Sequence, residues 1–398
     1  MIVTVACASI LLSSLIVKTA YENTKLTDYE KIQIILGGNG EKEENGLQLN
    51  RKTKHNWGTE YVFNFPLGKT FRDYESKKQA LEDGLVKEVA LTFDGWITLK
   101  VYDKEFPAQV HHEPNPSEWS FIAGINRDFS PKRINFEKIP HLIIGGGTRY
   151  GKSNMIHTII TSLLESKPDS VKFTLIDLKG GIELSEYENL KQTVKVAYEP
   201  YEAVEALEVV YKLMRATQEQ LRSKGHRKIQ DSHIKERHFI IIDEVGELNP
   251  SEAVSKEEKA LKIECQKYLS QIARLGAGLG FRMILATQYP TGDIIPRQCK
   301  QNSDGKICFR VQSGVASRVV LDEEGAEKLP DIKGRAILQA GTNKTIIQTP
   351  LVSYDTIREL VSKNLKEESV PDEQENFTGI EQPPGGNTFI IEETRLSD

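Results

Sequence analysis

The feature that most constrains this 398-residue chain is a glycine-rich loop at 146–153, which reads Gly-Gly-Thr-Arg-Tyr-Gly-Lys-Ser. The loop follows an apolar run at 142–145 and precedes a stretch of helical character at 154–164. A strand, a G-x-x-x-x-G-K-S loop and a helix in this order form a phosphate-binding loop, because backbone N–H groups and the helix N-terminus then face the anion. We therefore expect an α/β protein that binds a nucleoside triphosphate.

The residue types in this loop have distinct expected roles. Lys152 is expected to neutralise the β- and γ-phosphates, and Ser153 to bind Mg²⁺. The loop thus predicts ATP and Mg²⁺ as cofactors. The predicted nucleotide-binding residues are Gly146, Gly147, Thr148, Arg149, Tyr150, Gly151, Lys152, Ser153 and Asn154.

Further short apolar runs predict buried strands at 142–145, 173–176, 239–242, 283–286 and 307–311. Such runs are typical of a parallel sheet with helices on both faces. The run at 239–242 is followed by Asp243 and Glu244, and the run at 283–286 is soon followed by Gln288. We predict that Asp243 binds Mg²⁺ and that Glu244 polarises the attacking water. Gln288 is expected to contact the γ-phosphate or that water, since strand ends meet at one edge of a parallel sheet.

Changes of pattern along the chain divide it into five predicted segments. Before the motor, a strand, a helix and two strands joined by an Asp-Gly turn at 94–95 predict a small α+β domain of βαββ order. The predicted segments are a membrane-anchor candidate at 1–20, a helix and linker at 21–54, the small domain at 55–112, a P-loop ATPase motor at 117–362 and an acidic tail at 363–398.

The first segment carries sixteen uncharged residues at 2–17, closed by Lys18. As a helix they would span about 24 Å, less than the roughly 30 Å of a bilayer core. We expect a single-pass or peripheral membrane anchor, and lysines on its far side would place the motor in the cytoplasm. A buried N-terminal helix, or a fragment of a longer transmembrane hairpin, is the alternative.

Net charge and cysteine content exclude few classes of protein. The net charge of −5 neither requires nor rules out nucleic acid, and the four cysteines form no CxxC pair that would indicate a zinc site or a disulfide framework. The densest basic run is 212–237. Its predicted DNA contacts are Arg222, Lys224, Arg227 and Lys228. A solvated amphipathic helix and loop would give the same run, so both interpretations stay open.

Several separate motifs between about 121 and 338 resemble the FtsK/SpoIIIE family of DNA translocases. They are Ile-Pro-His at 139–141 before the loop, IDLKGGIELSEY at 176–187, IARLG at 272–276, LATQYP at 285–290, and the segments 309–311, 317–322 and 325–329. The resemblance implies a RecA-like ATPase, usually a hexameric ring, that moves double-stranded DNA. It also implies an arginine that completes a neighbour's site, for which Arg274 and Arg318 are the candidates beside Arg310.

This chain also departs from the family pattern. Arg149 and Tyr150 replace the usual small residues of the loop, and Ala277 stands where an arginine is common. No winged-helix DNA-orienting domain is expected in the residues after the motor. With the small domain, these features are more similar to the FtsK-type coupling proteins of conjugative elements in Gram-positive bacteria. That resemblance implies a relaxase and secretion-channel proteins as partners. A protein-export ATPase and a nucleotide-gated scaffold are the alternatives.

Overall fold

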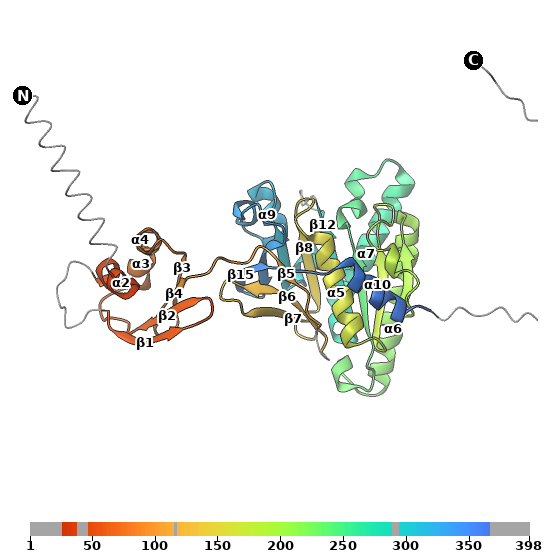
Figure 1. The fold of residues 1–398 in the computed structure, drawn as a ribbon. Helices are drawn as coiled ribbons and strands as arrows, with labels where there is room; N and C mark the ends of the chain where they lie inside the picture. Colours follow the sequence, from red (N-terminus) through yellow and green to blue (C-terminus); the bar gives the residue numbers. More distant parts are fainter. Residues whose placement is uncertain (1–25, 38–46, 115–117, 289–293, 367–398) are drawn as a thin grey trace, which may run out of the picture.

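The computed structural model describes residues 26–37, 47–114, 118–288 and 294–366 (Figure 1). The predicted membrane segment at 2–17 and nearly all of the predicted acidic tail lie outside these ranges. Among the described residues, no helix has both the length and the apolar character that crossing a bilayer requires.

The described residues after the small domain are organised around a ten-stranded sheet of order β10-β9-β11-β12-β8-β13-β14-β15-β6-β7. Its parallel strands are β8 (His141–Gly145), β9 (Val171–Ile176), β10 (Thr193–Ala197), β11 (Arg237–Ile242), β12 (Phe281–Thr287) and β13 (Gly305–Phe309). Its antiparallel strands are β6 (Ser120–Asn126), β7 (Pro131–Asn135), β14 (Arg335–Ala340) and β15 (Asn343–Gln348). A separate parallel pair joins β5 (Val110–His111) to β16 (Pro350–Leu351). The prediction of parallel strands is confirmed, and the sheet as a whole is mixed.

Helices cover both faces of the parallel strands (Figure 1). One face is covered by α5 (Lys152–Ser166) and α10 (Tyr354–Lys363). The other is covered by α6 (Pro200–Ser223), α7 (Lys256–Leu279), α8 (Arg297–Gln301) and α9 (Gly314–Leu321). Side chains of β11 alternate between the two faces of the sheet, because successive residues of a strand point to opposite faces.

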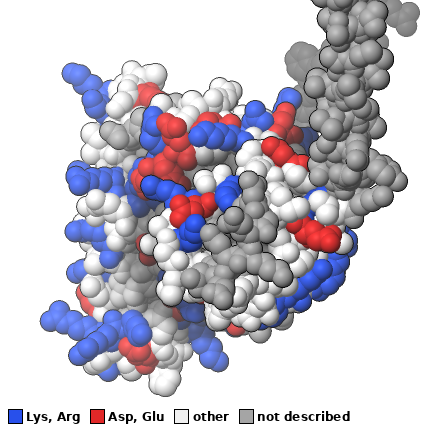
Figure 2. All heavy atoms as spheres, turned by 90° about the vertical axis from the view of Figure 1, so that its left-hand side faces the viewer, with Lys and Arg blue, Asp and Glu red and all other residues white. Residues whose placement is uncertain are grey.

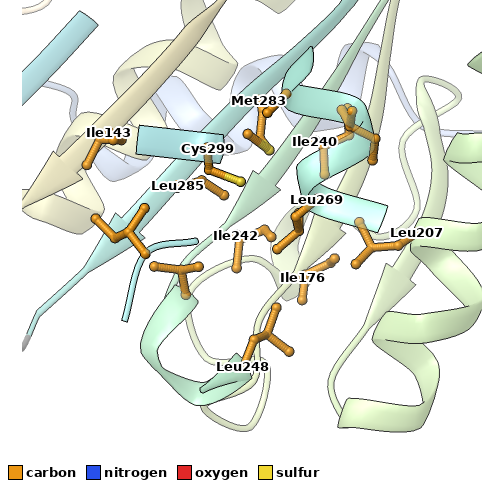
Figure 3. Close-up of a cluster of buried hydrophobic side chains, with 14 of the residues drawn as sticks. Ile143, Ile176, Leu207, Ile240, Ile242, Leu248, Leu269, Met283, Leu285 and Cys299 are labelled. Atoms are coloured by element: carbon orange, nitrogen blue, oxygen red, sulfur yellow. The ribbon is translucent and has the colours of Figure 1, made fainter. Parts of the chain in front are cut away.

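The alternation divides the apolar residues into two cores. Ile240 and Ile242 pack with Leu207 of α6 and Leu269 of α7 (Figure 3), whereas Ile241 faces the α5 side. The strand residues on both faces are completely buried. Each such side chain contributes about 1.5–3 kcal/mol of burial free energy, so the central strands are rigid supports for the loops that follow them.

The small domain has a four-stranded antiparallel sheet of order β1-β2-β4-β3. Its elements are α2 (Asp28–Gly37), β1 (Leu49–Lys54), β2 (Gly58–Phe63), α3 (Phe71–Glu75), α4 (Lys78–Leu85), β3 (Val89–Phe93) and β4 (Ile97–Tyr102). The order of elements along the chain differs from the predicted βαββ, because an additional strand, β1, precedes β2 and pairs with it. The sequence of β1 is polar and mostly exposed, so it gives no apolar alternation. Ile32 and Leu36 of α2 also belong to this domain's core.

Polar contacts join the small domain to the turn between β6 and β7. Arg127 donates to Glu88 at 2.5 Å and lies over the ring of Tyr102, with its guanidinium carbon 4.2 Å from the ring centre. Asp128 pairs with Lys100 at 2.7 Å. Burial favours the neutral acid, but Lys100 and Ser130 lower the pKa of Asp128 to about 2. Two ion pairs and a cation–π contact thus fix this turn against the small domain.

Candidate nucleotide site

The glycine-rich loop connects the carboxyl end of β8 to the start of α5. Its first two residues are tied to neighbouring strands: Gly146 N–H donates to the Thr287 carbonyl at 3.2 Å, and Gly147 N–H donates to the Arg310 carbonyl at 3.0 Å. A Cβ atom at Gly146 would lie 2.6 Å from Cβ of Phe309, so a larger residue does not fit there. The start of the loop is therefore held in place by β12 and by the residue after β13.

The following residues present their backbone to the site. In the part of the chain that the structure describes, the N–H groups of Thr148, Arg149 and Gly151 have no acceptor. Arg149 and Gly151 have positive φ angles of 73° and 121°, which is costly for an arginine. Unpaired N–H groups on a strained turn before a helix are the arrangement that binds phosphate.

Tyr150, one of the unusual loop residues, has a structural place. Its carbonyl accepts from Gly334 N–H at 2.9 Å, and its ring packs beside Gly147. A hydrogen bond to Asp331 raises the pKa of the Tyr150 phenol. The large side chain therefore braces the loop against the segment before β14.

Lys152 and Asp243 form a buried ion pair. The ammonium lies 2.5 Å from Asp243 Oδ1 and 2.8 Å from its backbone carbonyl, and the two side chains are 3% and 1% exposed. Burial raises the pKa of the Asp243 carboxyl, whereas Lys152 acts in the opposite direction. The residue predicted to neutralise phosphates thus lies against the residue predicted to bind Mg²⁺.

Glu244 lies where three adjacent strands end. Its Oε2 atom accepts from the backbone N–H of Gln288, which follows β12, and from Lys179, which follows β9; both distances are 2.8 Å. β9, β11 and β12 are neighbours in the sheet, so their carboxyl ends meet at one edge. The structure therefore brings Lys152, Asp243, Glu244 and Gln288 together at the edge where sequence analysis placed them.

The loop after β9 contributes residues that sequence analysis did not assign to the site. Buried Asp177 accepts the backbone N–H groups of Glu183 and Leu184 at 2.9 and 3.1 Å. The imidazole of His157, 3.8 Å away, and the hydroxyl of Ser153 lower the pKa of Glu183. The available signal is the Asp-x-Lys sequence at the end of a buried strand, which lies within the family-like motif at 176–187.

Three buried oxygen atoms at this edge have no partner among the described residues: Asp243 Oδ2, Glu244 Oε1 and Thr287 Oγ1. Buried polar atoms without partners are costly, and such atoms at a strand edge indicate a bound ion, water or ligand. No group of three or more His, Cys, Asp or Glu side chains within the described ranges could hold a metal by itself. This donor set fits Mg²⁺, which uses one or two protein oxygens together with phosphates and water.

A pocket of about 540 Å³ opens beside the loop. It is lined by Gly147, Thr148, Tyr150, Gln288, Arg310, Val311, Gln312, Ser313, Ala316 and Glu327. Its volume is in the range of small-ligand sites. The loop and Gln288 share one cavity, as a nucleotide site requires.

Three other predicted site residues, Asn154, Arg274 and Arg318, do not line this pocket. The Asn154 amide bridges α5 to β16, donating to the Pro350 carbonyl at 2.6 Å and accepting from Val352 N–H at 3.1 Å. Arg274 is exposed on α7 and donates to Gln271, and Arg318 is exposed on α9 and pairs with Glu324. Neither arginine lines the pocket of its own chain.

The predicted DNA contacts are separated from the nucleotide edge. α6 starts after β10 and ends before β11, so its last turn and the next loop lie at the amino edge of the parallel strands. Arg222, Lys224, Arg227 and Lys228 are all exposed there. The face in Figure 2, seen from the small-domain side of the molecule, carries Asp and Glu side chains among its Lys and Arg side chains. A surface at the amino edge could therefore contact phosphates while the other edge holds the nucleotide.

Comparison with solved structures supports this fold. The pCW3 conjugation coupling protein TcpA, in a monomer form with ATPγS, is similar with a TM-score of 0.61 and 22% identity. The match covers 84% of this chain and 97% of that one. The cytoplasmic domain of the Thermomonospora curvata type VII secretion ATPase EccC is similar with a TM-score of 0.53 and 23% identity, over 66% of this chain and 33% of that chain.

Sequence comparison finds similarity to one family within the larger domain. Residues 107–246 match the FtsK/SpoIIIE family. The DNA translocase FtsK of Sporosarcina ureae is 30% identical over 290 residues, which are 66% of this chain and 36% of the relative. The DNA translocase SpoIIIE of Bacillus subtilis (strain 168) is 31% identical over 279 residues, which are 63% of this chain and 34% of the relative. The chain thus spans about a third of the length of these relatives, and its residues 107–246 match the family that its motifs resemble.

Proposed function

We propose that this chain is an ATPase that uses hydrolysis to move double-stranded DNA. The observation that carries the proposal is the meeting of Lys152, Asp243 and Glu244 beside a loop in which several backbone N–H groups have no acceptor among the described residues. Sequence similarity supports DNA as the substrate, since the relatives that match are named DNA translocases.

Each of these residues has a defined part in the proposed reaction. Lys152 exchanges its contact with Asp243 for the β- and γ-phosphate oxygens, which are charged acceptors for an ammonium group. Ser153 and Asp243 are the residues that would hold Mg²⁺, and the ion would neutralise charge on the phosphates. Glu244 accepts a hydrogen bond from the attacking water through Oε1, while Gln288 orients the γ-phosphate or that water. Positioning and charge neutralisation then account for the catalysis.

A RecA-like ring, most simply a hexamer, is the assembly we propose for the active protein. Arg274 and Arg318 are exposed and do not line the pocket beside the loop in their own chain, so we propose that one of them completes the site of a neighbouring subunit. Arg227, Lys228 and their basic neighbours at the other edge of the sheet are the proposed DNA contacts.

Conjugative DNA transfer is the proposed setting. The similarity to TcpA extends over nearly all of that protein and includes part of this chain outside the 107–246 family match, which supports a shared architecture. We propose that residues 2–17 tether the motor to the cytoplasmic side of the membrane, and that a relaxase and channel proteins are its partners. Export of a protein substrate is the alternative, because the EccC domain has a similar fold.

The experiment is phosphate release from Mg²⁺–ATP by the purified full chain, with and without linear duplex DNA. Lys152→Ala serves as the blank, and Glu244→Gln tests the water-polarising residue. We expect hydrolysis that duplex DNA stimulates and that both substitutions remove, with ATP binding retained in Glu244→Gln. Hydrolysis indifferent to DNA would favour the protein-export alternative, and hydrolysis that survives Lys152→Ala would contradict the assigned site.

A further inference from the structure

A lysine outside the predicted site residues, Lys179, contacts the carboxylate of Glu244. Its ammonium lies 2.8 Å from Glu244 Oε2, the same oxygen that accepts from Gln288 N–H. The Glu244 side chain is 3% exposed, and its Oε1 has no partner among the described residues. One oxygen of this carboxylate is therefore held by two donors, and the other is left available.

The loop that carries Lys179 is held by hydrogen bonds to a buried carboxylate at its start. The carboxylate of Asp177, which is completely buried, accepts the N–H of Lys179 at 3.3 Å as well as two later N–H groups of the same loop. Gly181 has a φ of +72°, and a Cβ atom there would lie 2.6 Å from the ring of Tyr198. Hydrogen bonds to Asp177 and the close approach of Tyr198 thus set the backbone conformation of the loop that carries Lys179.

We propose that Lys179 is a positioning residue for Glu244. Together with Gln288 N–H it anchors Oε2, so that Oε1 points to the water that attacks the γ-phosphate. This inference rests on the proposed function, ATP hydrolysis with Glu244 as the residue that polarises water. It adds the loop after β9 to that function and gives the Asp-x-Lys motif a role.

The physical consequence concerns orientation and charge. Without Lys179, Oε2 keeps a single N–H donor, and the carboxylate is able to rotate about its terminal bond, whose torsion has a broad energy minimum. A hydrogen bond between charged groups is among the stronger ones in proteins. Removing it is expected to lower kcat about 10- to 100-fold. Lys152, and not Lys179, is assigned to the phosphates, so the KM for Mg²⁺–ATP is expected to stay within about threefold.

Steady-state ATPase assays of the full chain with duplex DNA test this assignment. The variants are Lys179→Met, Lys179→Arg and Glu244→Gln, with the double variant Lys179→Met/Glu244→Gln. Lys191→Met is the matched control, because Lys191 is a half-exposed lysine outside the site. We expect Lys179→Met to lower kcat alone, Lys179→Arg to restore part of it, and the control to match the unsubstituted chain. In the Glu244→Gln background, Lys179→Met should have no further effect, because the carboxylate that it positions is absent.

Binding of a fluorescent ATP analogue shows whether each variant is folded and competent to bind. Lys179→Met that binds the analogue normally and turns over at the unsubstituted rate would overturn the inference while leaving the proposed function intact. A raised KM with unchanged kcat would also overturn it, since Lys179 would then act on the phosphates. Absence of hydrolysis by the unsubstituted chain would overturn both the inference and the function on which it rests.

Discussion

Replacing Lys152 by Met is expected to destabilise the nucleotide-free protein as well as to abolish ATP binding. The ammonium and the Asp243 carboxylate are 2.5 Å apart with almost no exposure. At an effective dielectric constant of about 20, that separation corresponds to about 6–7 kcal/mol of gross attraction. Part of this offsets the cost of removing both charges from water, and breaking a buried pair typically costs about 3–5 kcal/mol.

Differential scanning fluorimetry without nucleotide provides the measurement. For a domain of this size, 1 kcal/mol shifts the melting temperature by about 2–4 °C, so Lys152→Met should melt about 6–20 °C lower. The double variant Lys152→Met/Asp243→Asn should recover more than half of this loss, because no uncompensated charge remains buried. As a second readout, Mg²⁺–ATP should raise the melting temperature of the unsubstituted chain and leave that of Lys152→Met unchanged.

The pH dependence of the melting temperature tests the direction of this effect. Burial raises the pKa of Asp243 above its ordinary value of 3.8, so the ionised carboxylate costs stability at neutral pH and protonation relieves this cost as the pH falls. Without Lys152 the cost is larger. The melting deficit of Lys152→Met should therefore shrink as the pH falls through the raised pKa of Asp243. A variant that melts within about 2 °C of the unsubstituted chain at neutral pH would show that the ion pair contributes nothing, and would refute this reasoning.

Two further predictions concern other parts of the larger domain. Glu137 accepts from buried Arg237 and Arg282 at 2.7 and 3.2 Å, so Glu137→Gln should cost about 2–4 kcal/mol in thermal or urea unfolding. Burial opposes ionisation of Glu137, but both arginines lower the pKa of its carboxyl below the ordinary value of 4.5. The ionised carboxylate therefore stabilises the folded protein above that pH, and this stabilisation is lost as the pH falls further. The acid denaturation of Glu137→Gln should lack this loss of stability. Reversing the charge of both Arg227 and Lys228 should abolish stimulation of hydrolysis by duplex DNA with the basal rate unchanged, and stimulation that persists would sink the DNA-contact assignment.

The sequence was most informative where one short pattern fixes both structure and chemistry. The strands before Gly146, Asp243 and Gln288 were recognisable as apolar runs, and the parallel arrangement implied that their ends meet. The convergence of Lys152 on Asp243 follows from that topology. Its detail, a direct ion pair between the two side chains, could not be predicted, because it depends on side-chain packing.

The antiparallel half of the sheet was missed for a physical reason. β7 and β15 read PKRIN and NKTIIQ, and each exposes part of its length, so neither shows a continuous apolar run. Strand formation there depends on pairing with β6 and β14. Local sequence does not encode such pairing. The polar strand β1 was missed in the same way.

Lys179 illustrates the limit for site residues. The Asp-x-Lys motif was visible at the end of β9, but its partner Glu244 lies 65 positions later. Sequence order alone does not place β9 beside β11. The sheet order supplies this information, and with it the contact between the two loops.

The most direct test of the central claim is displacement of a third strand from a triplex on linear duplex DNA by the full chain with Mg²⁺–ATP. The account predicts displacement that requires ATP, that is lost in Lys152→Ala and Glu244→Gln, and that is delayed as the distance from the DNA end to the triplex increases. ATP hydrolysis by the unsubstituted chain without any displacement, on DNA that it binds, would contradict the claim that this protein moves double-stranded DNA.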